Sequence, residues 1–166
     1  MSINPALDDV SFCPRCGGKA DVRFPHSIMC GNCGYGAYYN PKPVAAALTL
    51  TRDGRVILLR RGFEPGKGLL TIPGGFVDLG ESVEQAAVRE AMEELEIRVE
   101  LTGLVGVYSR EGDRIVLVVF SAVTDDEPQL TDEATEILVV EPDAIPWDEL
   151  AFWSTERALR EFLATA

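Results

Sequence analysis

Apolar and β-branched residues gather in short runs along most of the chain, and polar turn residues separate these runs. Val44–Thr51 and Arg55–Arg60 flank Arg52-Asp53-Gly54, and an Asp-Gly turn between two such runs predicts a β-hairpin. A second pair of runs surrounds Glu111-Gly112-Asp113 in the same way. The pattern predicts five strands, which cover Val44–Thr51, Arg55–Arg60, Leu101–Tyr108, Arg114–Thr124 and Ile137–Val140.

Two stretches follow the period of an α-helix instead. The run Ser82-Val-Glu-Gln is a capping box, so a helix is predicted to begin at Ser82. At 3.6 residues per turn its apolar positions are expected on one side, opposite Glu90 and Glu94. These apolar positions are Val88, Ala91, Met92 and Leu95. A final helix is predicted to be capped by Ser154 and to reach about Leu163.

Composition and charge narrow the range of partners. The chain has 166 residues, of which 46% are hydrophobic and 25% are charged, as in ordinary folded domains. No apolar run reaches the roughly 18 residues that a membrane span needs, so no membrane partner is expected. With 15 Lys and Arg against 27 Asp and Glu, the formal charge of −12 repels a polyanion, and no nucleic-acid partner is expected. Residues 1–10 are expected to form a short disordered lead.

Three glutamates stand one turn apart on the first predicted helix. Glu90 is followed at spacings of three and four by Glu93 and Glu94, so all three lie on the same side. Bare carboxylates in this arrangement repel one another unless cations neutralise them. Hard oxygen ligands suit Mg²⁺ or Mn²⁺, ions that usually act on phosphates. A solvated acidic face is the other interpretation, and the three glutamates alone leave both open.

The residues around these glutamates carry a longer pattern. Gly75 is followed after five residues by Glu81, after seven more by Arg89-Glu90-Ala91, and then by Glu93-Glu94 and Glu96-Ile97. This spacing resembles the Nudix box of the Nudix hydrolases, which cleave nucleoside diphosphates linked to another group. The resemblance implies an α+β fold, the Nudix α/β/α sandwich with a mixed sheet. Glu96 departs from the family, which has glycine where the helix ends in a left-handed conformation. A glutamate held there costs about 1 kcal/mol or more.

The resemblance also implies roles for the matching residues. The three glutamates are implied to be catalytic and to bind Mg²⁺ or Mn²⁺, and the carbonyl of Gly74 is implied as a further metal ligand. Glu81 is implied to orient Arg89, a pair with a mainly structural role.

Other candidate residues lie outside the box. In the family a glutamate from a later loop often acts as general base or extra ligand, and Glu136 is the first candidate here, as a catalytic residue. Glu133 is the second candidate, because both precede the strand Ile137–Val140. Arg60 and Arg61 end a strand ahead of the box and are candidates for substrate binding, because guanidinium groups suit phosphates. Two surface arginines explain the same residues equally well.

All four cysteines lie in two Cys-x-x-Cys-Gly turns, which contain Cys13, Cys16, Cys30 and Cys33. Each turn offers two thiolates to one tetrahedral ion, so a structural Zn²⁺ site in a zinc ribbon over residues 11–40 is predicted. Two disulfides are the competing interpretation, but a cytoplasmic location, which we expect because no signal peptide is recognised, keeps thiols reduced. His26 is expected in a loop and not as a ligand. By the resemblance, residues 41–166 are then expected to form the Nudix hydrolase domain.

The substrate is predicted from resemblance as well. A ribbon before a Nudix domain resembles the NADH pyrophosphatases, but their Ser-Gln-Pro-Trp signature after the box is missing here. The chain is more similar to compact ADP-ribose and FAD pyrophosphatases, through Cys-Pro-x-Cys-Gly-Gly, Tyr39-Asn40-Pro41-Lys42 and the segment Ile145–Phe152. This likeness implies a homodimer that hydrolyses ADP-ribose or FAD and releases AMP. The alternatives are an NADH pyrophosphatase and a non-catalytic module that senses ADP-ribose.

Overall fold

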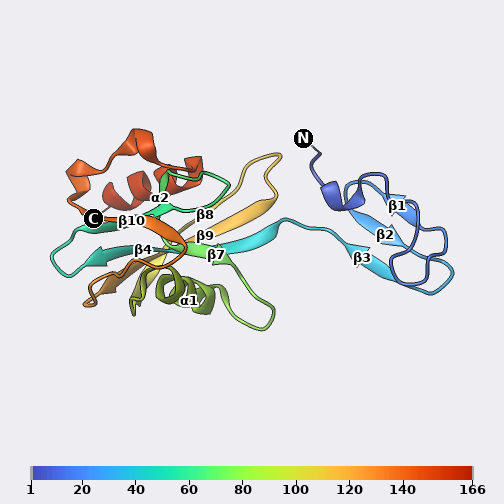
Figure 1. Cartoon of the computed structure of the whole chain (residues 1–166), viewed down its shortest axis with the longest axis horizontal. Coiled ribbons are helices and arrows are strands. Elements are labelled where there is room, and N and C mark those ends of the chain that lie inside the picture. The colour runs from blue at the N-terminus through green and yellow to red at the C-terminus, as the bar shows by residue number, and fades with distance from the viewer. Residues whose placement is uncertain (1, 166) are drawn as a thin grey trace. The chain divides into compact units, whose positions relative to one another are not determined.

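The computed structural model describes residues 2–165 and divides the chain into two compact units. The N-terminal unit comprises the chain up to Lys42 together with Arg110–Ile115, and the large unit comprises Pro43–Ser109 and the residues from Val116 onward. Figure 1 shows the course of the chain through each unit. No pattern along the chain indicated that Arg110–Ile115 belongs with the first unit. That grouping depends on tertiary contacts such as the hydrogen bond from the Lys42 N–H to the Arg114 carbonyl, at 2.9 Å.

A three-stranded antiparallel sheet with the order β1-β2-β3 is the framework of the N-terminal unit. Its strands are β1 (Asp21–Arg23), β2 (Ser27–Met29) and β3 (Gly36–Tyr38). The start of the chain differs from the predicted disordered lead, because Pro5–Leu7 form a 3₁₀ turn, η1. Leu7 is buried, and the side-chain amide of Asn4 donates a hydrogen bond to the Pro25 carbonyl at 2.6 Å. The contact with Pro25 joins segments that are distant along the chain, so the composition of residues 1–10 does not reveal it.

The large unit contains a seven-stranded sheet with the central order β10-β5-β4-β9-β8, while β6 pairs with β5 and β7 pairs with β4. Its strands are β4 (Lys42–Thr51), β5 (Val56–Arg61), β6 (Leu70–Thr71), β7 (Gly74–Phe76), β8 (Glu100–Tyr108), β9 (Ile115–Thr124) and β10 (Ala134–Val140). The Lys42–Arg114 hydrogen bond places the starts of β4 and β9 side by side, so these neighbours run in the same direction. The β4–β5 and β8–β9 pairs are antiparallel, and the sheet is therefore mixed, as predicted.

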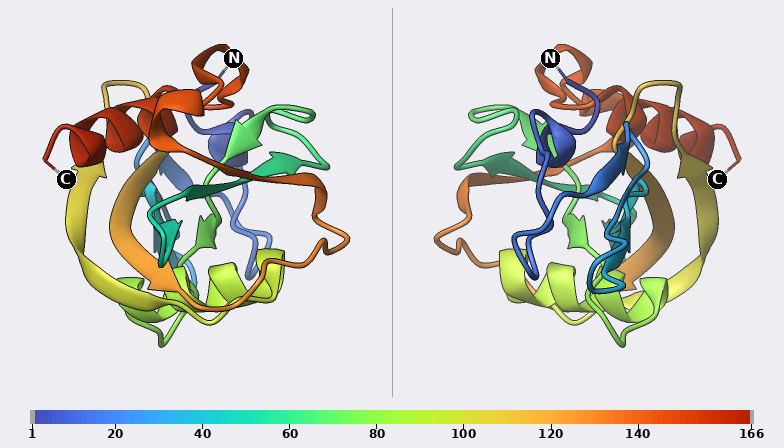
Figure 2. Two further views of the ribbon diagram at one scale, coloured as in Figure 1. Left: turned by 90° about the vertical axis from the view of Figure 1, so that its left-hand side faces the viewer. Right: turned by 90° about the vertical axis from the view of Figure 1, so that its right-hand side faces the viewer.

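One helix covers each face of this sheet (Figure 2). Ala45 and Ala47 of β4 pack with residues of α1 (Val83–Leu95), whereas the alternate residues Ala46 and Leu48 pack with residues of α2 (Trp153–Leu163). Alternation along a strand buries both of its faces in this way. Two 3₁₀ turns, η2 (Pro142–Ala144) and η3 (Trp147–Glu149), connect β10 to α2. The α+β sandwich predicted from the sequence is confirmed.

The capping box of α1 is present as predicted, but the buried side of the helix is not the predicted one. The Ser82 hydroxyl accepts from the Gln85 N–H, and the Gln85 side chain accepts from the Ser82 N–H. Val88 and Met92, which we expected in the core, are 37% and 41% exposed. The side that packs on the sheet carries Ala87, Ala91 and Leu95, together with Glu90 and Glu94. The two glutamates therefore lie on the inner side of the helix.

The prediction that Ser154 caps the last helix is wrong. Phe152 holds the N-cap position of α2 without a side-chain hydrogen bond, and Ser154 lies buried inside the first turn. A contact with the sheet positions the residue before this N-cap, because the Ala151 N–H donates to the Leu70 carbonyl at 2.8 Å. Neither helix, nor any other within residues 2–165, has the length and apolar character needed to cross a bilayer.

Candidate active site and cysteine centre

Arg89 lies at the middle of the acidic side of α1. Its Nε and Nη2 donate to the two carboxylate oxygens of Glu81 at 3.1 and 2.8 Å, so the predicted pair forms. Nη1 donates to Glu90 at 2.7 Å and to Glu93 at 2.8 Å, and Nη2 also reaches the Phe76 carbonyl at 3.0 Å. Glu81 in turn accepts a backbone N–H, which helps to hold its pKa below the usual range after the larger effect of Arg89. One guanidinium thus ties the turn before α1 to the helix.

Glu94 is the most deeply buried of the acidic side chains. It is 3% exposed, and its carboxylate accepts the Gly74 N–H at 2.7 Å. Burial raises the pKa of Glu94 to about 8, and the charges of Glu90 and Glu133 add to that effect. Burial also raises the pKa of Glu90, whose oxygens lie so close to Gly75 that a Cβ there would clash with them. The glycine of the box therefore leaves room for a carboxylate.

The carbonyl of Gly74 points to the same side as its N–H. Gly74 is aligned with Ala46 of β4, but the inter-strand hydrogen bonds are made by its neighbours, from the Ala47 N–H to the Pro73 carbonyl and from the Val77 N–H to the Pro43 carbonyl. The N–H and C=O of one residue in a strand point in one direction. Because the Gly74 N–H reaches Glu94, the Gly74 carbonyl is directed away from β4 on the side of the carboxylates.

The chemistry of this donor set fits a hard divalent cation. Three glutamates and a carbonyl offer oxygen atoms, and Arg89 is the cation paired with two of those glutamates. Within residues 2–165 the carboxylates do not gather around one point, because Glu90 and Glu93 bond to Arg89 while Glu94 accepts from Gly74. Glu93 has a half-exposed side chain and therefore has room to turn.

The loop before β10 brings Glu133, and not Glu136, to these carboxylates. The Thr131 hydroxyl donates to the Glu94 carbonyl at 3.0 Å, and the charge of Glu133 acts on Glu90 and Glu94. Glu136, the first candidate from the sequence, is aligned with Arg60 across the β10–β5 pair and accepts its Nε–H at 2.6 Å. The alternation of β5 directs this pair to the α2 face, away from α1. Spacing along the chain could not distinguish the two glutamates.

The same alternation separates the two candidate arginines. Arg60 donates to Glu136, to Glu149 at 2.7 Å and to the Gly68 carbonyl at 2.9 Å. Arg61 lies on the α1 face, is 9% exposed, and interacts electrostatically with Glu94 and Glu133. Of the two, Arg61 is the one that the structure brings to the carboxylates.

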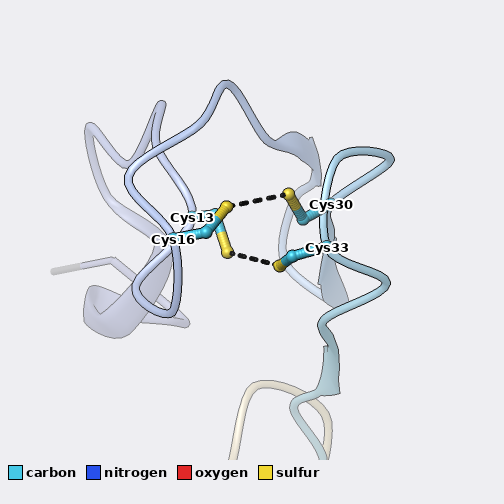
Figure 3. Close-up of side chains that lie close together, drawn as sticks. All are labelled: Cys13, Cys16, Cys30 and Cys33. Atoms are coloured by element: carbon cyan, nitrogen blue, oxygen red, sulfur yellow. Dashed lines mark hydrogen bonds between the residues drawn. The ribbon is translucent and has the colours of Figure 1, made fainter.

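The four cysteines converge in the N-terminal unit (Figure 3). The Cys13 and Cys33 sulfurs lie 3.7 Å apart, as do those of Cys16 and Cys30, and all four sulfurs lie within 4.8 Å of one another. Sulfurs bound at the usual 2.3 Å to a tetrahedral zinc ion stand about 3.8 Å apart. A disulfide has a much shorter distance of about 2.05 Å. The arrangement therefore matches a four-thiolate metal site and not the two disulfides; His26 lies outside the cluster, in the β1–β2 turn.

The two cysteine turns have matching geometry. The Gly17 N–H donates to the Cys13 carbonyl at 2.9 Å and the Gly34 N–H donates to the Cys30 carbonyl at 3.0 Å. These glycines have φ values of 71° and 70°, a left-handed conformation that favours glycine. The Gly18 N–H and the side chain of Asn32 lower the pKa of the Cys16 thiol to about 6. Asn32, whose amide lies 3.6 Å from the Cys16 sulfur, carries no signal in the sequence.

A comparison with family models decides the affiliation. The model described as the NUDIX domain matches residues 40–165. The chain belongs to the Nudix family.

Relatives of this Nudix hydrolase agree with that result. An ADP-ribose pyrophosphatase of Methanocaldococcus jannaschii is 33% identical over 134 residues, which are 78% of this chain and 77% of the relative. The NAD-capped RNA hydrolase NudC of Haemophilus influenzae is 35% identical over 104 residues, but these are 60% of this chain and 39% of that protein. The crystal structure of a NUDIX hydrolase from Nitrosomonas europaea superposes with a TM-score of 0.84 at 30% identity, covering 93% of this chain and 91% of that one. These relatives support pyrophosphate hydrolysis as the reaction.

Two of the aromatic residues of this Nudix hydrolase line an open cavity on the α2 side. Tyr108 and Trp153 border it together with Val107, Ser109, Arg157 and Glu161, and its volume is about 260 Å³. The Tyr108 hydroxyl donates to Glu161 at 2.9 Å. Burial raises the pKa of Tyr108 to about 12, and the Glu161 carboxylate is the second cause of this increase. Tyr108 is thus a core residue at the wall of this cavity.

Proposed function

We propose that this Nudix hydrolase cleaves the pyrophosphate bond of a nucleoside diphosphate linked to another group, with ADP-ribose or FAD as substrate and AMP as one product. The observation that carries the proposal is the buried Glu94 carboxylate beside Glu90, with a charge that nearby groups compensate only in part. Such carboxylates favour a bound cation. The similarity to an ADP-ribose pyrophosphatase over most of both chains supports the choice of substrate.

Each residue of the site has a separate role in this reaction. Glu90, Glu93, Glu94 and the Gly74 carbonyl hold Mg²⁺ or Mn²⁺, which when bound neutralises phosphate oxygens and lowers the pKa of the attacking water. Arg89, which is bonded to Glu81, orients the carboxylates of Glu90 and Glu93. Glu133 accepts the proton of the attacking water, and Arg61 binds a phosphate oxygen.

The four cysteines of the N-terminal unit bind a structural Zn²⁺ ion in this proposal. The match between the observed 3.7 Å sulfur separations and tetrahedral thiolate geometry supports it. The N-terminal unit has few buried apolar side chains, so the metal supplies much of its folding free energy. Cysteines that are reduced and not joined in disulfides also support a cytoplasmic location.

A homodimer without a nucleic-acid partner completes the proposal. Leu104 and Val107, which are 60% and 58% exposed on the edge strand β8, support an apolar contact between subunits. Light scattering after size-exclusion chromatography measures the mass, and a monomer at micromolar concentration contradicts this part.

The experiment that tests the activity is product analysis with Mg²⁺ and ADP-ribose, FAD, NADH or a nucleoside triphosphate. We expect AMP from ADP-ribose or FAD, and a loss of at least about 100-fold in turnover for Glu94→Gln with an unchanged circular dichroism spectrum. Near-wild-type turnover of that variant contradicts the metal-site assignment.

Two other outcomes select the alternatives. Preferred turnover of NADH identifies an NADH pyrophosphatase, which the partial similarity to an NAD-capped RNA hydrolase favours. No turnover of any substrate, with tight ADP-ribose binding, identifies a non-catalytic sensor.

A further inference from the structure

The guanidinium of Arg61 lies against two aromatic rings. The guanidinium carbon lies 4.8 Å from the ring centre of Phe63 and 5.2 Å from that of Phe152, within the range of cation–π contacts. Its Nε donates to the Pro65 carbonyl at 2.7 Å. The side chain is therefore fixed along most of its length, although it comes from the last residue of β5.

The terminal nitrogens of Arg61 remain available to a ligand. Among residues 2–165 no hydrogen bond from Nη1 or Nη2 of Arg61 is found, and no enclosed side-chain nitrogen lacks a partner, so these two atoms reach solvent. The guanidinium interacts electrostatically with Glu94, Glu133 and Glu64, yet forms no ion pair within 4 Å with any of them. Arg60 provides the contrast, because its guanidinium is already bonded to two carboxylates.

The loop after β5 is shaped around this side chain. Both backbone groups of Arg61 are hydrogen-bonded to this loop, because its N–H donates to the Leu69 carbonyl and its carbonyl accepts the Gly68 N–H, each at 2.9 Å. Gly66 has φ of +77°, and a Cβ on it would lie 3.1 Å from the Ala151 Cβ, 3.6 Å from the Arg61 Cδ and 3.7 Å from the Phe152 ring. The loop thus packs closely against Arg61 and against the segment that enters α2.

That segment is itself anchored to the sheet. Leu150 forms a parallel bridge with Leu70 of β6, and the Ala151 N–H donates to the Leu70 carbonyl at 2.8 Å. These bonds fix the backbone immediately before Phe152. A ring from the C-terminal part of the chain is therefore brought to a cation at the end of β5.

We infer that Phe152 and Phe63 are positioning residues that hold the Arg61 guanidinium beside the carboxylate site, where it binds a pyrophosphate oxygen of the substrate. The inference rests on the proposed function for the identity of the ligand. A preorganised guanidinium loses little conformational freedom when it binds, so its position contributes to affinity and rate. The entry into α2 thereby becomes part of the active site.

A double-mutant cycle tests this link. Phe152→Leu keeps an apolar side chain without the ring, and we expect kcat/KM to fall about tenfold in the parent and less than about twofold in an Arg61→Gln background. Phe152→Tyr, which keeps the ring, should restore most of the loss. Phe162→Leu is the matched control, because Phe162 packs against the core cluster on the α2 face, which does not include Arg61. An equal loss from Phe152→Leu in both backgrounds overturns the inference.

Two further measurements separate this inference from the proposed function. The NMR resonance of the Arg61 Nε–H is identified by its absence in Arg61→Gln. It should shift in Phe152→Leu and stay in place in Phe162→Leu. No shift in Phe152→Leu overturns the role of the Phe152 ring in positioning Arg61. Calorimetry with methylenediphosphonate and Mg²⁺ reports ligand binding without turnover, and we expect weaker binding in Arg61→Gln and Phe152→Leu. If ADP-ribose and FAD are not hydrolysed but these binding losses occur, the proposed substrate fails and the inference stands. Equal binding by all variants overturns it.

Discussion

The burial of Glu94 decides the charge state of the candidate site. A carboxylate buried between a helix and a sheet loses most of its hydrogen bonds to water, and here the Gly74 N–H replaces one of them. Glu90 and Glu133 lie close enough to add repulsion. The charged form of Glu94 is therefore costly, and binding of the divalent cation that we propose for this site would relieve the cost.

The pH dependence of stability follows from the raised pKa of Glu94, about 8 against an ordinary value of 4.5. A raised pKa means that the folded state holds the proton more tightly than the unfolded state does. The stabilising contribution is present below pH 4.5 and is lost as the pH rises to about 8. We expect the Mg²⁺-free protein, with its cysteine centre intact, to unfold at lower urea concentration at pH 8 than at pH 5.5. In Glu94→Gln this difference should shrink, and an unchanged difference contradicts the assignment.

Glu96 is a second residue in an unfavourable state, because its backbone is left-handed. It ends α1 with φ of 55° and ψ of 31°, the left-handed conformation predicted for this position from the family pattern. We expect Glu96→Gly to raise the free energy of unfolding by about 1 kcal/mol, because glycine adopts this conformation without strain. Urea unfolding measures the change. Glu84→Gly, in the first turn of the same helix, is the control and should lower stability by about 1 kcal/mol. A loss of stability in Glu96→Gly contradicts this account.

At the scale of elements, the rotation of α1 about its axis decides which side chains reach the site. The sequence places alanines next to the glutamates and larger apolar residues one position away, so periodicity alone favoured Val88 and Met92 as core residues. The sheet accepts the alanine side instead, because small residues allow α1 to approach β4 and β7 closely, and the glutamates are buried with them. This choice depends on packing distance, which a hydrophobicity pattern does not contain.

The strand β10 and the loop before it give another prediction at this scale. Glu133→Gln should lower kcat at least about tenfold, because this carboxylate lies beside the box glutamates. Glu136→Gln should change kcat less than about threefold, because its partner Arg60 extends from the other face of the sheet. Steady-state kinetics with Mg²⁺ compares the two variants. The reverse order of effects restores Glu136 as the base.

The whole molecule combines two units that are stabilised differently. The large unit has two apolar clusters, one on each face of its sheet, whereas the N-terminal unit contributes few buried apolar residues apart from Leu7, Ile28 and two cysteines. Burial of apolar surface stabilises the first, and we expect that coordination of a metal by the four thiolates stabilises the second.

Removal of zinc should therefore act on one unit. We expect about one zinc ion per chain, and after treatment with a strong chelator we expect proteolytic cleavage within residues 11–40. Trp147 and Trp153 both lie in the large unit, so their fluorescence should not change. Cys30→Ser should show the same cleavage without chelator. Resistance to proteolysis after complete zinc removal contradicts a structural role for the metal.

The sequence by itself determined five strands of the large sheet, the capped helix α1, the family and the residue types of both candidate centres. Five strands, the capped helix α1 and the spacing of box and cysteine residues are local patterns, and local patterns can be read along a chain. Only the tertiary structure decided which side of α1 is buried, that Glu133 and Arg61 face the site while Glu136 and Arg60 do not, and that Phe152 lies against Arg61. Each of these depends on strand register or on contacts between distant segments, and neither quantity is encoded in spacing along the chain.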